Sequence, residues 1–491
     1  MIIRTKKTWK ELCDTNVEKH DGVGRRDFLQ KGLATGVMSI CLPNLVTGRL
    51  IEKASAADLS CPAPAQVKGA IAQIYAEGGP TMGARFIGEA QAQSMSAGMA
   101  SNYGISGAAN LVKIGTNLYV DKTSPFGAAL LLGPRGWVGG QAAWKSQVLD
   151  KIVGGGHLGQ FSADDGAGQN SGLIGLSSGL KTSVMGKDIS VGVGSTLAAF
   201  AQGMSVAAVN SATVANFART FTLTPAAAGL ISSSTMDLAS DAANGISDGL
   251  ALALETGSRK AASIVKTSAG CGFYGNSPMA DPNYGTRIFT PNDARLISKI
   301  NNITALSAEE QAYLGAYFQS ALGFAGGVFT EYGGRDYHGS DPLTNVAVKD
   351  IQEARNIVMF LAACAAADAP GAIMYTSNGQ AIANGVTNGN VNIEGQAVNV
   401  NGPNAAGDAG GSYNAGLIIM FSPTGNLPNS KLTGTVDSNG NCKIDPNVGS
   451  SKEAMTGLYA SAVAFVNNGS IPLAIQSKLP TTAGLSKIMV I

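Results

Sequence analysis

The stretch GGRDYHG, residues 333–339, places an aspartate and a histidine two positions apart, directly after a glycine pair. In an extended chain, Asp336 and His338 project to the same side, so the two side chains can share one ligand. Carboxylates and imidazoles are common ligands of divalent metals. The pair is therefore a candidate metal or catalytic corner, and the alternative is a polar turn at the end of a strand.

A second group of reactive side chains lies in HLGQFSADDGAGQNSG, residues 157–172, which we expect to form one Gly-rich loop. It holds His157, Asp164, Asp165 and Ser171. Adjacent carboxylates with a histidine and a hydroxyl are the ingredients of a hard-metal site with an activated nucleophile or water. Two competing interpretations are that Asp164-Asp165-Gly is an ordinary turn and that His157 is a loop residue without a ligand.

Four short apolar segments bounded by Gly, Pro or Asn are the strands expected to position these residues. They are 69–77, 326–332, 371–377 and 415–422. We expect them to form one mostly parallel sheet of an α/β fold, in which the carboxyl ends of the strands make the edge that binds ligands.

The clearest helix lies between the second and third of these strands, within residues 341–370. Asp341 is a plausible N-cap, Pro342 takes the first helical position, and Pro370-Gly371 stops the helix. Its apolar stripe comprises Leu343, Ala347, Ile351, Ala354, Val358 and Leu361. Strand, helix and strand form a βαβ crossover, which places the Asp336 and His338 loop at the carboxyl edge of the sheet.

Other strand ends should meet this edge. The first strand ends in Gly78-Gly79-Pro80-Thr81, where glycine permits close backbone approach. The third strand ends at Ser377, and Asp408 lies on the amino-terminal side of the fourth and is expected to fold back. Thr81 and Ser171 are the candidate nucleophiles, although no activating base lies at a defined spacing from either.

Two polar segments are expected to form β-hairpins. Residues 378–414, rich in Asn and Gly, alternate Val391/Ile393 and Val398/Val400, which predicts a hairpin excursion from the sheet. Residues 437–445, DSNGNCKID, resemble a calcium loop, but Cys442 replaces its glycine. A hairpin with an Asn-Gly turn is the simpler interpretation. One more helix is expected at about 451–467.

The amino-terminal segment GRRDFLQKG, residues 24–32, precedes an apolar run and the small residues 54–56. This pattern is typical of a twin-arginine signal peptide, and the apolar run is too short to span a bilayer stably. The residues that the export receptor reads are Arg25, Arg26, Phe28 and Leu29. A basic amphipathic helix is the alternative. The twin-arginine translocase carries folded proteins, which favours a metal or cofactor without proving one.

We therefore expect residues 1–56 to be a cleaved signal peptide and residues 57–491 to form a single large α/β domain without a transmembrane anchor. The protein would be periplasmic, secreted or on the cell surface. The net charge is +1, and no clustered basic face suggests a nucleic-acid partner. Cys364 lies in the apolar helix and should be buried outside any disulfide, whereas the pairing of Cys61, Cys271 and Cys442 stays open.

Taken in order, these segments resemble a twin-arginine-exported family related to alkaline phosphatases and sulfatases. The shared pieces are the GGP turn, a His-x-x-x-Phe-x-Ala-x-Asp loop, GG-x-D-x-H before a long helix, and a Ser/Thr-x-x-G turn, over most of residues 69–425. The resemblance implies a three-layer sandwich with a mostly parallel central sheet. It also implies strand-end aspartates and histidines that bind one or two divalent metals, and a serine, threonine or modified cysteine that attacks phosphate or sulfate esters. Asp336 and His338 correspond to the Asp-x-His element, and Asp164 or Asp165 falls in the loop.

Three elements of that family pattern are weakened. The GGP turn continues through Thr81 to Arg85 without an aspartate, the turn after the third strand has neutral Asn378, and Asp408 lacks its neighbouring histidine. Amides in place of carboxylates remove charge that offsets bound cations. The resemblance therefore implies one divalent metal, whether Zn, Ca, Mg or Mn, or none.

Three functions are compatible with the sequence. The first is a metal-dependent hydrolase of phosphate or sulfate esters. The second, which the missing carboxylates favour, is a non-catalytic or weakly active descendant of that fold that binds an envelope or surface partner. The third is a structural cell-surface protein whose Gly, Ala and Asn serve assembly.

Overall fold

The computed structural model describes residues 69–76, 78–161, 189–191, 207–209, 294–322, 328–337, 339–377, 381–408, 414–433, 435–436, 442–443, 451–471 and 482–491. Every helix and strand named below belongs to one compact unit formed by residues 62–230 and 278–491. Several predicted residues lie outside the described part, namely Arg25, Arg26, Phe28, Leu29, Asp164, Asp165, Ser171 and His338. The backbone of His157 and Asp408 is described, but their side chains are not.

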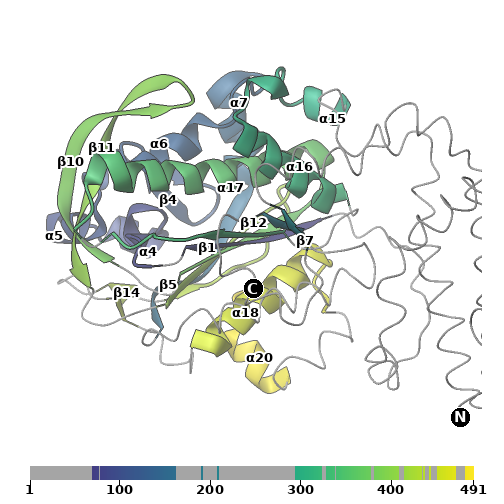
Figure 1. The fold of residues 1–491 in the computed structure, drawn as a ribbon. Helices are drawn as coiled ribbons and strands as arrows, with labels where there is room; N and C mark the ends of the chain where they lie inside the picture. The colour runs from purple at the N-terminus through teal and green to yellow at the C-terminus, as the bar shows by residue number, and fades with distance from the viewer. Residues whose placement is uncertain are drawn as a thin grey trace, which may run out of the picture. The chain divides into compact units, whose positions relative to one another are not determined.

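The fold is mixed α/β and is centred on an eight-stranded sheet with the order β13-β5-β12-β9-β1-β8-β6-β7 (Figure 1). Its strands are β1 (Ala70–Ala76), β5 (Ile152–Phe161), β6 (Ile189–Val191), β7 (Ala207–Val209), β8 (Val328–Tyr332), β9 (Gly371–Ser377), β12 (Asn414–Phe421) and β13 (Leu432–Thr433). β1 lies between β8 and β9 and is parallel to both. All four strands expected from the sequence are present in the sheet.

The sheet is mixed because β12 runs antiparallel to both of its neighbours, β9 and β5. The chain reaches β12 from a hairpin that begins and ends beside the carboxyl end of β9, so the strand starts there and runs back. Ala415 is in register with Ser377. The start of β12 therefore lies at the same edge of the sheet as the end of β9.

The predicted crossover helix starts as one π-helical turn, Pro342–Val346, and continues as α17, Ala347–Ala367. Asp341 caps it as expected, because its Oδ1 accepts the Leu343 N–H at 2.9 Å and the Thr344 N–H at 2.7 Å. The helix ends before Pro370, since Asp368 takes a left-handed φ of 49°. α17 connects β8 to β9 and passes over β1, which lies between them.

The remaining described elements are smaller. β2 (Ile87–Gly88), β3 (Leu111–Ile114) and β4 (Leu118–Asp121) form a three-stranded sheet, and β14 (Thr435–Val436) pairs with β15 (Cys442–Lys443). The helices are α4 (Glu89–Gln93), α5 (Ala97–Tyr103), α6 (Pro125–Leu132), α7 (Gly140–Gln147), α15 (Ala294–Ile297), α16 (Ala308–Leu322), α18 (Ser451–Val466) and α20 (Thr482–Ile488). β14 and β15 pair antiparallel, as the hairpin interpretation predicts, whereas residues 437–441, with the predicted Asn-Gly turn, lie outside the described residues. No helix in the described ranges is both long and apolar enough to cross a bilayer.

Helices cover both faces of the sheet (Figure 1). Ile74 of β1 and Ile373 of β9 pack with α16 and α17 in one apolar cluster. Ile71 and Met374, one or three positions away, pack with α18 in another. The two clusters follow from the period of two along a strand. Cys364 in α17 belongs to the first cluster and is fully buried as expected, and the structure shows no disulfide bond there.

The Asn- and Gly-rich segment forms the predicted hairpin, β10 (Ala381–Ile393) with β11 (Gln396–Asp408), as a separate two-stranded sheet. Its apolar side is packed inward, with Ile393 and Val400 buried against the helical layer. Figure 1 shows the hairpin as a long curved ribbon at the margin of the described elements.

Candidate functional site

The carboxyl ends of β1, β8 and β9 meet as the crossover predicted. Ala76 is in register with Tyr332 on one side and Ser377 on the other. The turn after β1 then packs against the loop after β8, because a Cβ on Gly78, whose φ is +118°, would lie 2.4 Å from the Asp336 nitrogen. The Tyr337 N–H also donates to the Gly79 carbonyl at 3.3 Å. Gly78 therefore has the close-approach role that the sequence indicated.

The predicted site residues are distributed unevenly around this edge. Asp336 is exposed. Thr81 is 1% exposed, so its hydroxyl is not open to a substrate from solvent. The buried Ser377 hydroxyl donates to the Gly78 carbonyl at 3.3 Å. Asp408 ends β11 opposite Ala381, on the side of the sheet where the sequence placed it.

His157 lies in a strand. The expectation of one loop over residues 157–172 is wrong for 157–161, which belong to β5. His157 is in register with Gly416 of β12 and Thr433 of β13. Pairing on both sides overrides the low strand preference of the three glycines that precede it.

The loop after β8 alternates between solvent and the interior. Arg335 and Tyr337 are 5% and 0% exposed, whereas Asp336 between them is exposed. An extended backbone sends successive side chains to opposite sides. The interior side therefore carries Arg335 and Tyr337, and the residue chosen from the sequence, Asp336, faces the other way.

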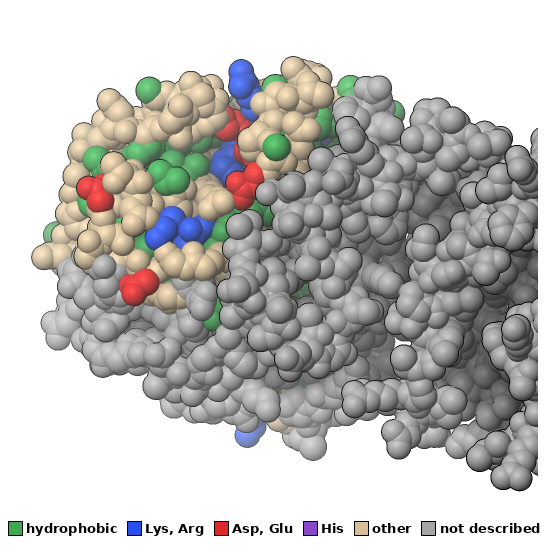
Figure 2. Space-filling view, viewed as in Figure 1, with side chains coloured by type: hydrophobic (Ala, Val, Ile, Leu, Met, Phe, Trp, Pro, Cys, Tyr) green, Lys and Arg blue, Asp and Glu red, His purple; other side chains and the backbone are tan. Residues whose placement is uncertain are grey.

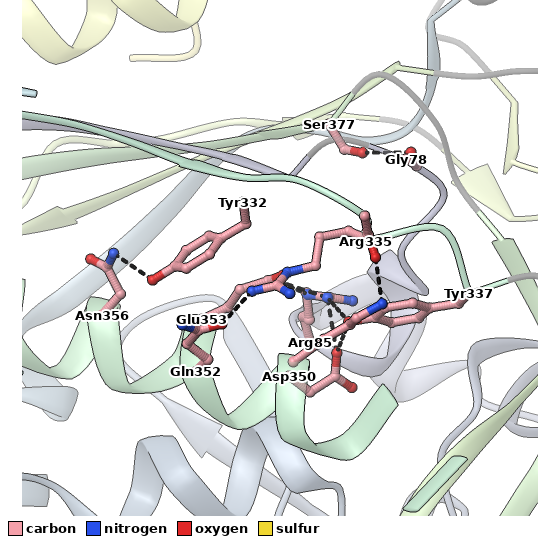
Figure 3. A network of polar contacts seen from close by, with 12 residues as sticks. Gly78, Arg85, Tyr332, Arg335, Tyr337, Asp350, Gln352, Glu353, Asn356 and Ser377 are labelled. Atoms are coloured by element: carbon pink, nitrogen blue, oxygen red, sulfur yellow. Dashed lines mark hydrogen bonds and ion pairs between the residues drawn. The ribbon is translucent and has the colours of Figure 1, made fainter. Parts of the chain in front are cut away.

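Arg85, which follows the 3₁₀ turn Met82–Ala84, is at the centre of the buried edge. Its Nη2 lies 2.9 Å from Oδ1 of Asp350 and 2.9 Å from Oε2 of Glu353, and all three side chains are 0% exposed. Its Nε donates to the same Glu353 oxygen at 3.0 Å, and its Nη1 donates to the Thr81 carbonyl at 2.9 Å. Figure 3 shows Arg85 directed toward the carboxylates of α17.

A second guanidinium completes the charge balance. Arg335 Nε donates to Oε1 of Glu353 at 2.8 Å, and its Nη2 donates to the Gln352 side-chain oxygen at 2.6 Å. The Tyr375 hydroxyl donates to the other Glu353 oxygen. Both oxygens of Glu353 are therefore engaged by groups from three different parts of the chain, and Figure 3 shows two of these groups, Arg85 and Arg335. We call Arg85, Arg335, Asp350 and Glu353 the arginine–carboxylate cluster.

Aromatic side chains surround this cluster. The Arg85 guanidinium lies 5.5 Å from the ring centre of Tyr337, 5.6 Å from Tyr375 and 5.9 Å from Phe126. These distances are within the range of cation–π attraction. The Tyr337 hydroxyl also donates to Oδ1 of Asp350 at 2.6 Å. The rings exclude water, and the hydroxyls supply hydrogen bonds in its place.

Burial dominates the electrostatics of Asp350. It raises the pKa of the Asp350 carboxyl to about 6, although the nearby Arg85 guanidinium acts in the opposite direction. Burial alone would lower the pKa of Arg85, but Asp350 and Glu353 together hold it well above its ordinary value. Within the described residues, Oδ2 of Asp350 and the hydroxyl of Thr81 are buried without a hydrogen-bond partner. Oδ2 is therefore the oxygen that can take up the proton as the pH falls to about 6.

The hydrogen bonds continue from the cluster toward α16. Gln352 Nε2 donates to Glu309 at 2.6 Å, and the Tyr313 hydroxyl donates to the same carboxylate at 2.7 Å. Tyr332 then donates to Tyr313 at 2.8 Å. The network therefore ties the edge of the sheet to both helices on that face.

Sequence reasoning missed the two carboxylates of this cluster because α17 is buried on almost every side. The apolar stripe through Ile351 and Ala354 was taken as its only interior face. A signal was nevertheless present, since Asp350, Glu353 and Asn356 recur every three residues and so share a second face of the helix. From the sequence, Arg85 was considered only as the end of a turn that lacks the aspartate expected from the family resemblance.

The described part of this edge does not fit a two-metal centre. Asp350 and Glu353, the carboxylates that lie deepest, already pair with guanidinium groups, and no three His, Cys, Asp or Glu residues among the described ones form a group able to hold a metal ion. A cation there would have to displace Arg85 from a buried position in which two of its nitrogens donate to one oxygen of Glu353. The arrangement holds together the turn after β1, the loop after β8, β9 and α17, and leaves Asp336 exposed at the surface.

No family model matches the chain, and no curated protein or solved structure matches it either.

Proposed function

We propose that the chain is an exported, non-catalytic binding or assembly protein of the cell envelope, built on an alkaline-phosphatase-like three-layer fold. One observation carries this proposal. The turn after β1 lacks the aspartate that the resembling family has there and leads instead to Arg85, which is paired to Asp350 and Glu353 at 2.9 Å and fully buried.

The charge arithmetic of the cluster supports a structural role for it. Two guanidiniums face two carboxylates, so the cluster is neutral when Asp350 is ionised. Arginine cannot lose its proton in proteins and therefore cannot act as a base. A permanently charged residue locked by two carboxylates preserves the shape of the edge but supplies neither a nucleophile nor an empty coordination position.

Metal content and esterase activity of the purified full chain test this proposal. We expect no stoichiometric Zn, Ca, Mg or Mn, and no hydrolysis of phosphate or sulfate esters above background when each metal is added. Asp336→Asn should leave the free energy of unfolding within about 0.5 kcal/mol of the wild type, as for an ordinary surface substitution.

If the protein is instead a metal-dependent ester hydrolase, the same measurements should give the opposite results. The hydrolase function requires about one equivalent of divalent metal in the wild type, ester turnover that depends on it, and loss of both in Asp336→Asn. Ser340→Ala is the matched control, because Ser340 lies in the same loop, where its hydroxyl donates to the Asp336 carbonyl at 3.3 Å and accepts from Nδ2 of Asn345 at 3.5 Å. If Asp336→Asn loses metal and turnover while Ser340→Ala keeps them, the non-catalytic proposal is wrong.

A further inference from the structure

The outward side of the distal β10–β11 hairpin is a row of amides. Asn388, Asn390 and Asn392 alternate with inward residues along β10 and are exposed, whereas Val391 and Ile393 are buried. Asparagine is depleted in strands, so strand formation does not explain this row. In Figure 2 the corresponding region is mainly tan, the colour of uncharged polar side chains and backbone.

These amides already bond to one another across the hairpin. Asn390 is in register with Asn399, and Asn388 with Asn401. Asn388 Nδ2 donates to Asn399 Oδ1 at 2.8 Å, and Asn399 Nδ2 donates to Asn390 Oδ1 at 3.2 Å. An amide is both a donor and an acceptor, so identical amides are self-complementary without any charge.

The backbone of the same three residues points to the open edge of β10. The turn residues Glu394 and Gly395 have φ of 53° and 82°, which is a two-residue type I′ turn. In such a turn the closing pair, Ile393 and Gln396, exchanges both backbone hydrogen bonds. From this pair onward, hydrogen-bonded and non-hydrogen-bonded residue pairs alternate along the hairpin. Asn388, Asn390 and Asn392 occupy the non-hydrogen-bonded pairs, so their backbone N–H and C=O groups point away from β11.

This distal edge lacks the usual protection of a strand edge. Near its base, β10 is interrupted by register shifts between Ile382 and Val386. Between 386 and 393 the register is unbroken and the sequence has no proline and no charge. Natural edges are normally blocked by such features. In the described part of the chain, no backbone hydrogen bond from another element reaches Asn388, Asn390 or Asn392.

The edge of β11 is already partly used. The Asn401 N–H donates to the Thr123 carbonyl at 2.7 Å, and Pro403 has no N–H to offer. The hairpin therefore presents one competent edge, that of β10.

We propose that this edge pairs with β10 of a second copy of the chain, antiparallel about a twofold axis through Asn390. The spacing of Asn388, Asn390 and Asn392 is symmetric about its centre, as a twofold interface requires. In this register Asn388 lies opposite Asn392 of the second copy and Asn390 lies opposite its own counterpart. In each of these pairs the backbone N–H and C=O groups of the two copies face each other and can form hydrogen bonds. The row of asparagine side chains then extends across four strands, β11 and β10 of one copy and β10 and β11 of the other. The inference concerns a surface away from the arginine–carboxylate cluster and does not depend on it.

Sedimentation of the full chain over a concentration series tests the pairing. The wild type should dimerise, and Asn390→Lys should raise the dissociation constant by about tenfold, because two like charges lie directly opposite. Asn390→Glu should do the same. Mixing the Lys and Glu variants should restore the dimer, since unlike charges then face each other, and this restoration also shows that both variants fold.

Asn399→Lys is the matched control, because it puts the same charge on the same face but one strand away from the axis. It should dimerise like the wild type. The proposal is wrong if the wild type is monomeric throughout the series, if Asn399→Lys and Asn390→Lys weaken the dimer equally, or if the mixed charge variants stay monomeric.

Discussion

The guanidinium of Arg85 pairs with two carboxylates that have no access to water, those of Asp350 and Glu353, and Arg335 supplies the second positive charge. A buried ion pair adds little net stability compared with apolar packing, but a buried charge that loses its partner is costly. The contribution of Arg85 is therefore asymmetric. The folded state gains little from forming the cluster and loses much if one member is removed.

Arg85→Met should lower the free energy of unfolding by about 3–5 kcal/mol, because it removes the buried cation that pairs with Asp350 and leaves two buried carboxylates with one guanidinium, that of Arg335. Urea unfolding followed by circular dichroism measures this change. Lys113→Met is the matched control, since it breaks a surface pair with Glu89 whose side chains are 44% and 39% exposed. It should cost less than about 1 kcal/mol. Equal effects of the two substitutions would contradict the account of the cluster.

The sequence indicated where the site lies but not which side chains form it. Asp336 and Thr81 were placed at the correct edge because strand ends follow from apolar segments and turn residues. Arg85 and Glu353 are 268 residues apart. The sequence around Arg85 gives no sign of Glu353, and the sequence around Glu353 gives no sign of Arg85. Because charged residues are rarely buried unless paired, neither residue could be predicted to be buried without knowing its partner. Burial of a charge is thus decided by a partner that sequence spacing does not identify.

At the level of elements, the strands and the long helix were predictable because each has a strong local pattern. The direction of β12 was not, since its apolar segment reads the same in a parallel or an antiparallel sheet. The strand at His157 was missed because three glycines are typical of a loop, and its pairing with β12 and β13 makes it a strand. Local sequence therefore predicts which segments form elements better than how they pair.

The turn of the β10–β11 hairpin is fixed to the helices by charge. Arg355 of α17 bonds to Glu394 in the turn and to Glu310 of α16, the latter at 2.6 Å. The Arg135 backbone N–H donates to Glu394 at 3.3 Å. Burial raises the pKa of Glu394 to about 7; Arg355 opposes this rise and Glu310 adds to it. Two carboxylates thus share one arginine.

This pKa fixes how pH should act on the hairpin. The docked turn holds a proton more tightly than a free carboxyl, whose ordinary pKa is 4.5. Its contribution to stability is full below that ordinary value and is lost as the pH rises through about 7. Amide protection of residues 386–403, corrected for the intrinsic rate of exchange, should therefore be higher at about pH 6 than at about pH 8.

Glu394→Gln should remove this difference, because the amide stays neutral over the same range. Hydrogen exchange with mass spectrometry measures it, and Glu89→Gln, at a surface pair, is the matched control that should keep the wild-type response. Protection that rises from pH 6 to pH 8 in the wild type would show that the sign is wrong.

At the scale of the whole molecule, the core is assembled from segments that are far apart in the chain. Gln73 of β1 donates to Thr376 of β9 at 3.0 Å across 303 residues. β1, an early strand, cannot complete its pairing before β8 and β9 have been made. Folds dominated by such long-range contacts form slowly and late. This topology is compatible with the proposed export of an already folded chain.

If the chain is exported as we propose, export should depend on both the twin-arginine motif and the folded core. Replacing Arg25 and Arg26 together with Lys should leave the precursor inside the cell with a protease-resistant core, whereas Arg4→Lys, which changes a basic residue outside the motif, should be exported normally. Arg85→Met keeps the signal intact but weakens the core, so the exported fraction of this variant should fall together with its free energy of unfolding.

Cell fractionation measures the exported fraction of each variant, and limited proteolysis measures whether the core of the retained precursor is folded. Export of the double-lysine variant at the wild-type level would exclude the twin-arginine route, and full export of a destabilised Arg85→Met would show that the route does not require this core to be folded.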